Sequence, residues 1–230
     1  MKGGRCPHPL YECKGESMDK YNVILFDLDG TITDPGIGIT NSVAHALKKY
    51  GITVEDRAEL YKFIGPPLHK SFEEFYGVDG LQAVDYYREY YRDKGIYENI
   101  VYGGIESMLK KLKAAGKKVI LATSKPEIFA REILRYFNLT EYFYYAAGAN
   151  LDGTLTDKAE VIAYALKEGN VTDKSTVLMI GDREHDIIGA KKNGIDSLGV
   201  LYGYGSREEL EAAGADYIAA TVEEMEKMLL

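Results

Sequence analysis

Short runs of bulky apolar residues recur along this chain, and most of them stop at a turn that contains Gly or Asp. The first run, Val23–Phe26, has four apolar residues, which is the length and composition of a buried strand. Similar runs predict strands at 118–122, 142–147, 176–180, 197–201 and 216–219. Between them, apolar residues at helical spacing predict helices at 105–115, 127–137, 159–168, 185–193 and 207–213, with a final helix at the C-terminus. Strands that alternate with helices predict an α/β fold, here a Rossmann-like, three-layer core with a parallel sheet covered on both faces.

A long stretch between the first two strands follows a different pattern, because it contains helical periodicity alone. It predicts four helices, at 39–50, 55–63, 68–76 and 81–94, separated by Gly and Pro. We therefore expect a helical domain at 35–102, inserted into a core formed by 19–34 and 103–230. Residues 1–18, which precede the core, are expected to form a poorly ordered leader.

Four tyrosines stand at helical spacing in the last of these helices, at positions 86, 87, 90 and 91. Such a stripe can form a platform for a ligand or pack in a seam between helices. The seam is the favoured interpretation.

Two carboxylates, Asp27 and Asp29, follow the first strand directly. Side chains two positions apart along a strand point to the same side, so two like charges would repel there. A divalent cation between them and a phosphate would make the arrangement tolerable. The pattern therefore predicts either a metal-assisted aspartyl nucleophile or an unusually acidic turn.

Further polar residues lie at the ends of later predicted strands. Thr123 and Ser124 follow the second strand, Asp182 and Asp186 follow the strand at 176–180, and Lys158 lies between these two groups. In an open parallel sheet, ligands bind outside the carboxyl ends of the strands, so groups at these ends can converge.

These motifs together resemble the haloacid dehalogenase superfamily of phosphohydrolases. The resemblance rests on Asp-x-Asp-Gly-Thr at 27–31, Thr123, Lys158 and Gly-Asp-x3-Asp at 181–186, and it covers the chain from Asn22 to the C-terminus. It implies that Asp27 is the nucleophile that forms an aspartyl-phosphate. It also implies that Asp29 protonates the leaving group and later activates water, for which its pKa should be raised.

The resemblance also implies a phosphate site and a metal site. Thr123, the Ser124 amide and Lys158 would contact the phosphate, and Lys158 would also stabilise charge in the transition state. Mg2+ would be held by Asp27, the main-chain carbonyl of Asp29 and Asp182, with Asp186 as a ligand or as a partner of a metal-bound water. In the inserted domain, the positions expected to select the substrate are Gly65, Pro66, His69 and Lys70.

The implied activity is a Mg2+-dependent phosphatase that hydrolyses small phosphomonoesters. Phosphoglycolate, a nucleoside 5′-monophosphate and a sugar phosphate all remain open as substrates, because the chain looks most like phosphoglycolate phosphatase-like enzymes with a helical cap, including 5′-nucleotidases. One alternative is a sugar-phosphate mutase of the β-phosphoglucomutase type. A second is a protein that binds a phosphometabolite without catalysis, although binding alone needs no nucleophile.

The amino-acid composition limits the possible binding partners and the cellular location of the protein. An apolar content of 46% and a charged content of 28% are ordinary for a globular protein. A net charge of −8 argues against nucleic acid or an anionic membrane surface as partner. The first 17 residues contain no apolar core of a signal peptide, so a cytoplasmic location is expected. Cys6, Cys13 and His8 in this leader are one ligand short of a closed zinc site.

Overall fold

The computed structural model describes residues 18–152 and 154–230. Met18–Lys20 forms a short 3-10 helix, and Met18, which the predicted leader includes, is buried in the core. Cys6, His8 and Cys13 lie outside the described residues, so the expectation of a poorly ordered leader stays a prediction.

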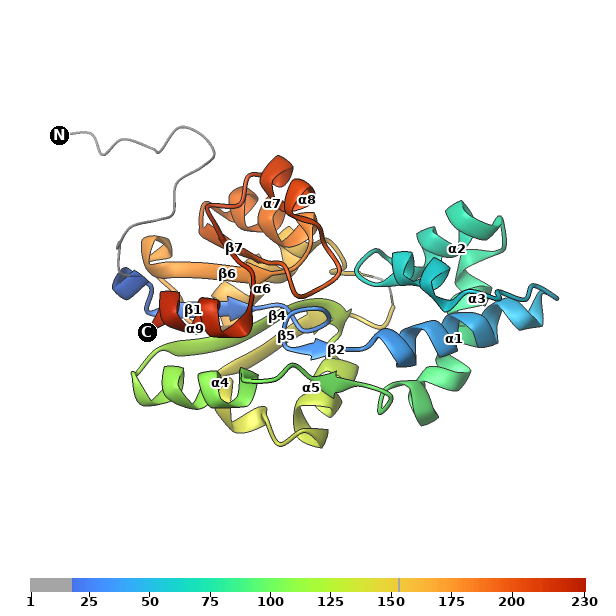
Figure 1. Cartoon of the computed structure of the whole chain (residues 1–230), viewed down its shortest axis with the longest axis horizontal. Helices are drawn as coiled ribbons and strands as arrows, with labels where there is room; N and C mark the ends of the chain where they lie inside the picture. Colours follow the sequence, from blue (N-terminus) through green and yellow to red (C-terminus); the bar gives the residue numbers. More distant parts are fainter. Residues whose placement is uncertain (1–17, 153) are drawn as a thin grey trace.

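Six parallel strands form the central sheet, as predicted (Figure 1). Their order is β5-β4-β1-β6-β7-β8, so β1 lies between β4 and β6. In this register Leu25 of β1 lies opposite Ile120 of β4 and Met179 of β6. The strands are β1 (Val23–Phe26), β4 (Lys118–Pro126), β5 (Tyr145–Ala149), β6 (Val177–Gly181), β7 (Asp196–Val200) and β8 (Tyr217–Ala219).

Side-chain alternation along the strands divides the core into two clusters, one on each face of the sheet. Ile24 and Phe26 pack in a cluster with helices α4 (Ile105–Ala114), α5 (Glu127–Tyr136) and α9 (Val222–Leu229). Val23 and Leu25 pack in the other cluster, with α6 (Lys158–Glu168) and α7 (Glu184–Asn193). Helix α8 (Arg207–Ala213) lies against α7 (Figure 1). Each fully buried Leu or Ile contributes roughly 1.5–3 kcal/mol, so the two clusters fix the sheet between its helical layers.

The helical insertion between β1 and β4 extends from one end of the sheet (Figure 1). It contains α1 (Gly36–Lys49), a 3-10 helix (Arg57–Phe63), α2 (Leu68–Tyr76), α3 (Gly80–Tyr90) and a π-helical turn (Tyr91–Gly95). The second predicted helix is therefore a 3-10 helix, and the fourth changes its hydrogen bonding at Tyr91.

A small antiparallel sheet joins the insertion to the core, and the sequence pattern did not predict it. It pairs β2 (Thr33–Asp34) with β3 (Ile100–Val101), so the entering and leaving segments lie side by side. The domain boundaries at 35 and 102 remain a prediction.

The tyrosine stripe on α3 divides between two roles. Tyr86 contacts Tyr50, the residue that caps the C-terminus of α1, with ring centroids 5.8 Å apart, which is the expected helix–helix seam. Tyr87 and Tyr91 stack on each other at 5.2 Å and line a pocket. The seam interpretation is thus right for only part of the stripe.

Across residues 18–152 and 154–230, none of the helices combines the length and the apolar character that crossing a bilayer requires.

Candidate active site

Side chains from three adjacent strands meet at the carboxyl end of the sheet. Asp27 follows β1, Thr123 lies in β4, and Asp182 follows β6. After β5 the chain returns to the other side of β1 to form β6, and this reversal of strand order is where open α/β sheets bind ligands. The predicted convergence of strand-end groups is therefore what the structure shows.

Lys158, the first residue of α6, lies between two buried carboxylates. Its Nζ is 2.6 Å from Oδ1 of Asp27 and 2.8 Å from Oδ1 of Asp186, and it donates a hydrogen bond to the Ala122 carbonyl at 2.9 Å. Burial acts to lower the pKa of Lys158, but the attraction of Asp186 and Asp27 outweighs it and raises the pKa. Lys158 is therefore a fixed cation at the end of β1.

Asp27, Asp182 and Asp186 form a compact group of acids, with ligand atoms within 4.8 Å of one another. Burial raises the pKa of Asp182 well above its usual value, and the nearby charges of Asp186 and Asp27 raise it further. Burial also raises the pKa of Asp186, although Lys158 opposes this shift. Such raised values indicate that the group lacks enough positive charge in the protein alone.

The closeness of Asp182 explains why the residue after Asp29 in the first motif, Gly30, is a glycine. Its φ is +85°, and a Cβ there would lie 2.2 Å from Oδ2 of Asp182. The turn after β1 thus closes directly over Asp182, which also accepts a hydrogen bond from the Tyr204 amide at 2.8 Å.

Asp29 lines the same pocket as Asp27 but has a different partner. Its Oδ2 lies 2.5 Å from Nζ of Lys125, at the end of β4. Burial raises the pKa of Asp29, as expected for a general acid, and Lys125 only partly opposes the shift. Sequence reasoning gave no role to Lys125, which stands in the Thr123–Pro126 run but two positions beyond the predicted phosphate contact.

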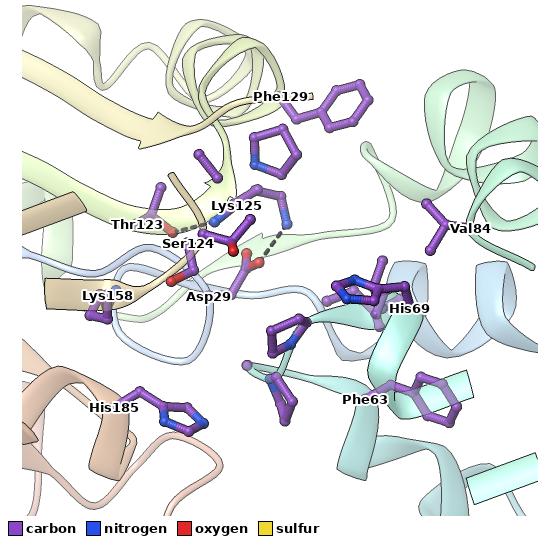
Figure 2. A pocket seen from close by; sticks show the side chains of 18 of the residues that line it. Asp29, Phe63, His69, Val84, Thr123, Ser124, Lys125, Phe129, Lys158 and His185 are labelled. Atoms are coloured by element: carbon purple, nitrogen blue, oxygen red, sulfur yellow. Dashed lines mark hydrogen bonds and ion pairs between the residues drawn. The ribbon is translucent and has the colours of Figure 1, made fainter. Parts of the chain in front are cut away.

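The predicted phosphate contacts line the pocket at the end of β4 (Figure 2). Thr123 is buried, and its hydroxyl accepts a hydrogen bond from the Lys125 amide at 3.2 Å. It does not cap α5, whose N-terminal cap is Pro126 without a side-chain hydrogen bond. Ser124 lies beside it at the pocket wall.

The insertion provides the opposite wall of this pocket, and most of this wall is apolar. Of the residues predicted to select the substrate, Gly65, Pro66 and His69 line the pocket. Lys70 is exposed and is not among the described residues of the lining, so its role in selecting the substrate stays a prediction. The insertion contributes the apolar and aromatic lining residues Ile39, Phe63, Leu68, Val84, Tyr87 and Tyr91, and α5 of the core adds Phe129.

Comparison with known proteins places the chain in a family. The sequence pattern of haloacid dehalogenase-like hydrolases matches residues 24–200. The chain belongs to this family. A 5′-nucleotidase from Pseudomonas aeruginosa is 45% identical over 213 residues, which cover 91% of this chain and 96% of that protein. The crystal structure of a predicted phosphatase from Clostridium acetobutylicum aligns with a TM-score of 0.87 and 50% identity, covering 90% of this chain and 97% of the other.

A relative with a different name matches nearly as much of this haloacid dehalogenase-like hydrolase. The tyrosine-protein kinase PtkA from Mycobacterium tuberculosis is 36% identical over 210 residues, covering 90% of this chain and 72% of that protein. The name of that relative describes a kinase that acts on tyrosine.

The family implies a divalent cation, and the three buried acids fit one. Carboxylate oxygens are the ligands that Mg2+ prefers, and the raised pKa values of Asp182 and Asp186 indicate a site that gains stability from added positive charge. The side chain of Asp29 is outside this group of acids. Its proposed contribution through the main-chain carbonyl stays a prediction.

Two arginines that sequence reasoning missed connect this hydrolase core to the insertion. Arg88 of α3 donates to the Leu151 carbonyl at 3.1 Å. Arg183 donates to the Ile64 carbonyl at 2.8 Å and is held by Glu209 at the same distance. Arg183 lies inside the Gly-Asp-x3-Asp motif, which is the one sequence signal that could have found it.

Proposed function

We propose that this protein is a Mg2+-dependent 5′-nucleotidase that hydrolyses nucleoside 5′-monophosphates through an aspartyl-phosphate on Asp27. The observation that carries the proposal is the pocket, in which the reactive carboxylates face a wall of aromatic and apolar side chains. Such a wall suits a nucleoside, because stacking of the base on aromatic rings and its removal from water both favour binding. The similarity to the 5′-nucleotidase of Pseudomonas aeruginosa supports the same substrate class.

The cations of the pocket favour a leaving group without a second negative charge. The Lys and Arg side chains of the lining already have acceptors: Asp27 and Asp186 for Lys158, Asp29 for Lys125, the Leu151 carbonyl for Arg88, and Glu209 with the Ile64 carbonyl for Arg183. Phosphoglycolate would bring a carboxylate, and the bisphosphate intermediate of a mutase would bring a second phosphate. Binding either group to Lys158, Lys125 or Arg183 would compete with a carboxylate that already pairs with that cation, which is costly in a buried site.

The mechanism begins with the carboxylate of Asp27 attacking the phosphorus. The bond to the 5′-oxygen breaks, its electron pair goes to that oxygen, and Asp29 delivers a proton to it. Thr123 donates its hydroxyl hydrogen to a phosphoryl oxygen, and the fixed charge of Lys158 offsets the negative charge that develops on the phosphoryl oxygens. Mg2+, held by Asp27, Asp182 and Asp186, would supply further positive charge when bound.

The second half of the reaction returns the enzyme to its starting state. Asp29, now ionised, takes a proton from a water molecule that attacks the phosphorus, and Asp27 is released as a carboxylate. The products are a nucleoside and inorganic phosphate. The apolar wall limits the access of other water during the first step.

A phosphate-release screen of the purified protein with Mg2+ tests the proposal. The panel contains nucleoside 5′-monophosphates, phosphoglycolate, β-glucose 1-phosphate and phosphotyrosine, with Asp27→Asn as the inactive control. We expect nucleotides to give the highest kcat/KM and the control to give none. A preference for phosphoglycolate would contradict the substrate, and a product of phosphate migration on the sugar would indicate a mutase.

The same preparation, incubated with γ-labelled ATP and a tyrosine-containing protein, separates hydrolysis from kinase activity. Label in inorganic phosphate alone agrees with a phosphatase. Label on the tyrosine would contradict the proposal.

A further inference from the structure

Lys125 occupies an unusual place beside the proposed general acid. Its side chain is almost buried, with 7% exposed, and its ammonium lies 2.5 Å from Oδ2 of Asp29. Figure 2 shows the chain of Lys125 folding back from β4 so that its ammonium reaches Asp29 over the pocket. A buried lysine that only filled space would not need this geometry.

The two oxygens of Asp29 are unequal as a result. Oδ2 is held by Lys125, whereas Oδ1 is buried and has no hydrogen-bond partner among the described residues. Leaving a buried polar atom without a partner destabilises the folded protein, so its retention at a reaction centre indicates a partner that arrives with the substrate. The leaving-group oxygen is such a partner.

Lys125 also contacts the insertion. Its ammonium lies 5.1 Å from the ring centroid of Tyr91, near the end of α3. Cations are attracted to the face of an aromatic ring at this range. The position of Lys125 therefore depends on the wall that closes over the pocket, and the orientation of Asp29 depends on Lys125.

We propose that Lys125 is a positioning residue that holds Oδ2 of Asp29 and so directs Oδ1 toward the leaving-group oxygen. The inference rests on the proposed phosphatase reaction and adds a residue to it. In the assisted step the P–O bond breaks, its electron pair stays on the departing oxygen, and the proton of Asp29 moves to that oxygen. Lys125 neither gains nor loses a proton in this step.

Comparing two leaving groups tests the proposal. An alkoxide, as in a nucleoside 5′-monophosphate, needs a proton to depart, whereas p-nitrophenolate does not. The parameter kcat/KM reports the steps up to leaving-group departure. With Lys125→Met we expect kcat/KM for the nucleotide to fall about tenfold or more, and that for p-nitrophenyl phosphate to change less than about threefold. Lys125→Arg should restore part of the loss.

Lys118→Met is the matched control, because Lys118 begins the same strand and donates to the Gly169 carbonyl away from the pocket. This variant should leave kcat/KM for both substrates unchanged. Equal losses of kcat/KM for both substrates in Lys125→Met, or no loss for either, would overturn the positioning role. The thermal midpoint of each variant separates these results from unfolding. If the wild type releases no phosphate from either substrate, the phosphatase proposal itself fails, and that result is distinct from the variant outcomes.

Discussion

Lys158 lies 2.6 Å from Asp27, and this contact joins the start of α6 to the end of β1 across 131 positions of sequence. The same ammonium reaches Asp186, so one cation serves two buried carboxylates. The reactive carboxylate is thereby fixed before any substrate binds. The stability of the core at this edge of the sheet therefore depends on a charged side chain.

Replacing Lys158 by Met should therefore reduce both activity and stability. Loss of one partner from a buried ion pair costs about 3–5 kcal/mol, because the remaining charge is left uncompensated. Phosphate release should fall at least about a hundredfold, since the same charge stabilises the transition state. Urea unfolding and phosphate-release assays measure the two effects. Lys167→Met, an exposed change on the same helix, should alter neither. A stable, active Lys158→Met protein would contradict this role.

Added Mg2+ should stabilise the folded protein, and EDTA should abolish phosphate release. Ligand binding to the folded state alone adds about 2.7 kcal/mol at one hundred times the dissociation constant. The acids of the group have few positive neighbours, so the cation relieves repulsion that burial intensifies. Thermal melts with and without Mg2+ measure the shift. Asp182→Asn should lose most of it, and an equal shift in that variant would show that Mg2+ binds elsewhere.

The sequence predicted much of the site because its residues stand where buried strands stop. An apolar run such as Val23–Phe26 has one reasonable structure, and parallel strands bring their carboxyl ends to one edge. Asp27, Thr123 and Asp182 were therefore expected at one edge of the sheet, and the strand order, which the sequence did not predict, places β4, β1 and β6 side by side. Lys158 followed from the order of the motifs and from its place at the start of a helix.

The partners of Asp29 and of the insertion could not be predicted in the same way. The register between β4 and β5 shifts between Thr123 and Pro126, so simple alternation no longer gives the direction of Lys125. Lys70 follows His69 on α2 and is turned by about 100° from it, which takes it out of the pocket. The two-residue strands β2 and β3 are too short to leave a pattern in the sequence.

Breaking the bridge from Arg88 to Leu151 should weaken substrate binding more than catalysis. The hydrogen bond holds α3 of the insertion against the segment that leads to α6, and such a bond contributes about 1 kcal/mol. In Arg88→Met the arrangement that encloses the pocket should be populated several-fold less, so KM should rise about two- to fivefold with a smaller change in kcat. Steady-state kinetics measure the split. Arg92→Met, an exposed change one turn further along, is the control. An unchanged KM in Arg88→Met would show that the bridge does not limit binding.

Asp196 should make the stability of the core depend on pH, away from the active site. It accepts a hydrogen bond from the Tyr21 hydroxyl at 2.5 Å and pairs with Lys20 at 3.0 Å. Burial acts to raise the pKa of Asp196, but these partners outweigh it and lower the pKa. A lowered pKa in the folded state stabilises the protein above the ordinary value of about 4, and this contribution is lost as the pH falls through the folded-state pKa.

Asp196→Asn should accordingly be less stable than the wild type by roughly 0.5–1 kcal/mol at pH 7, a modest figure because the carboxylate is partly exposed and solvent screens it. The difference should shrink toward zero as the pH falls through the lowered folded-state pKa of Asp196, where the wild-type carboxyl is protonated as well. Urea unfolding at several pH values measures it. Asp93→Asn, an exposed change in the π-helical turn, should show no comparable trend. A deficit in Asp196→Asn that stays constant from neutral to acidic pH would mean that shape and packing, not charge, explain the contribution of Asp196.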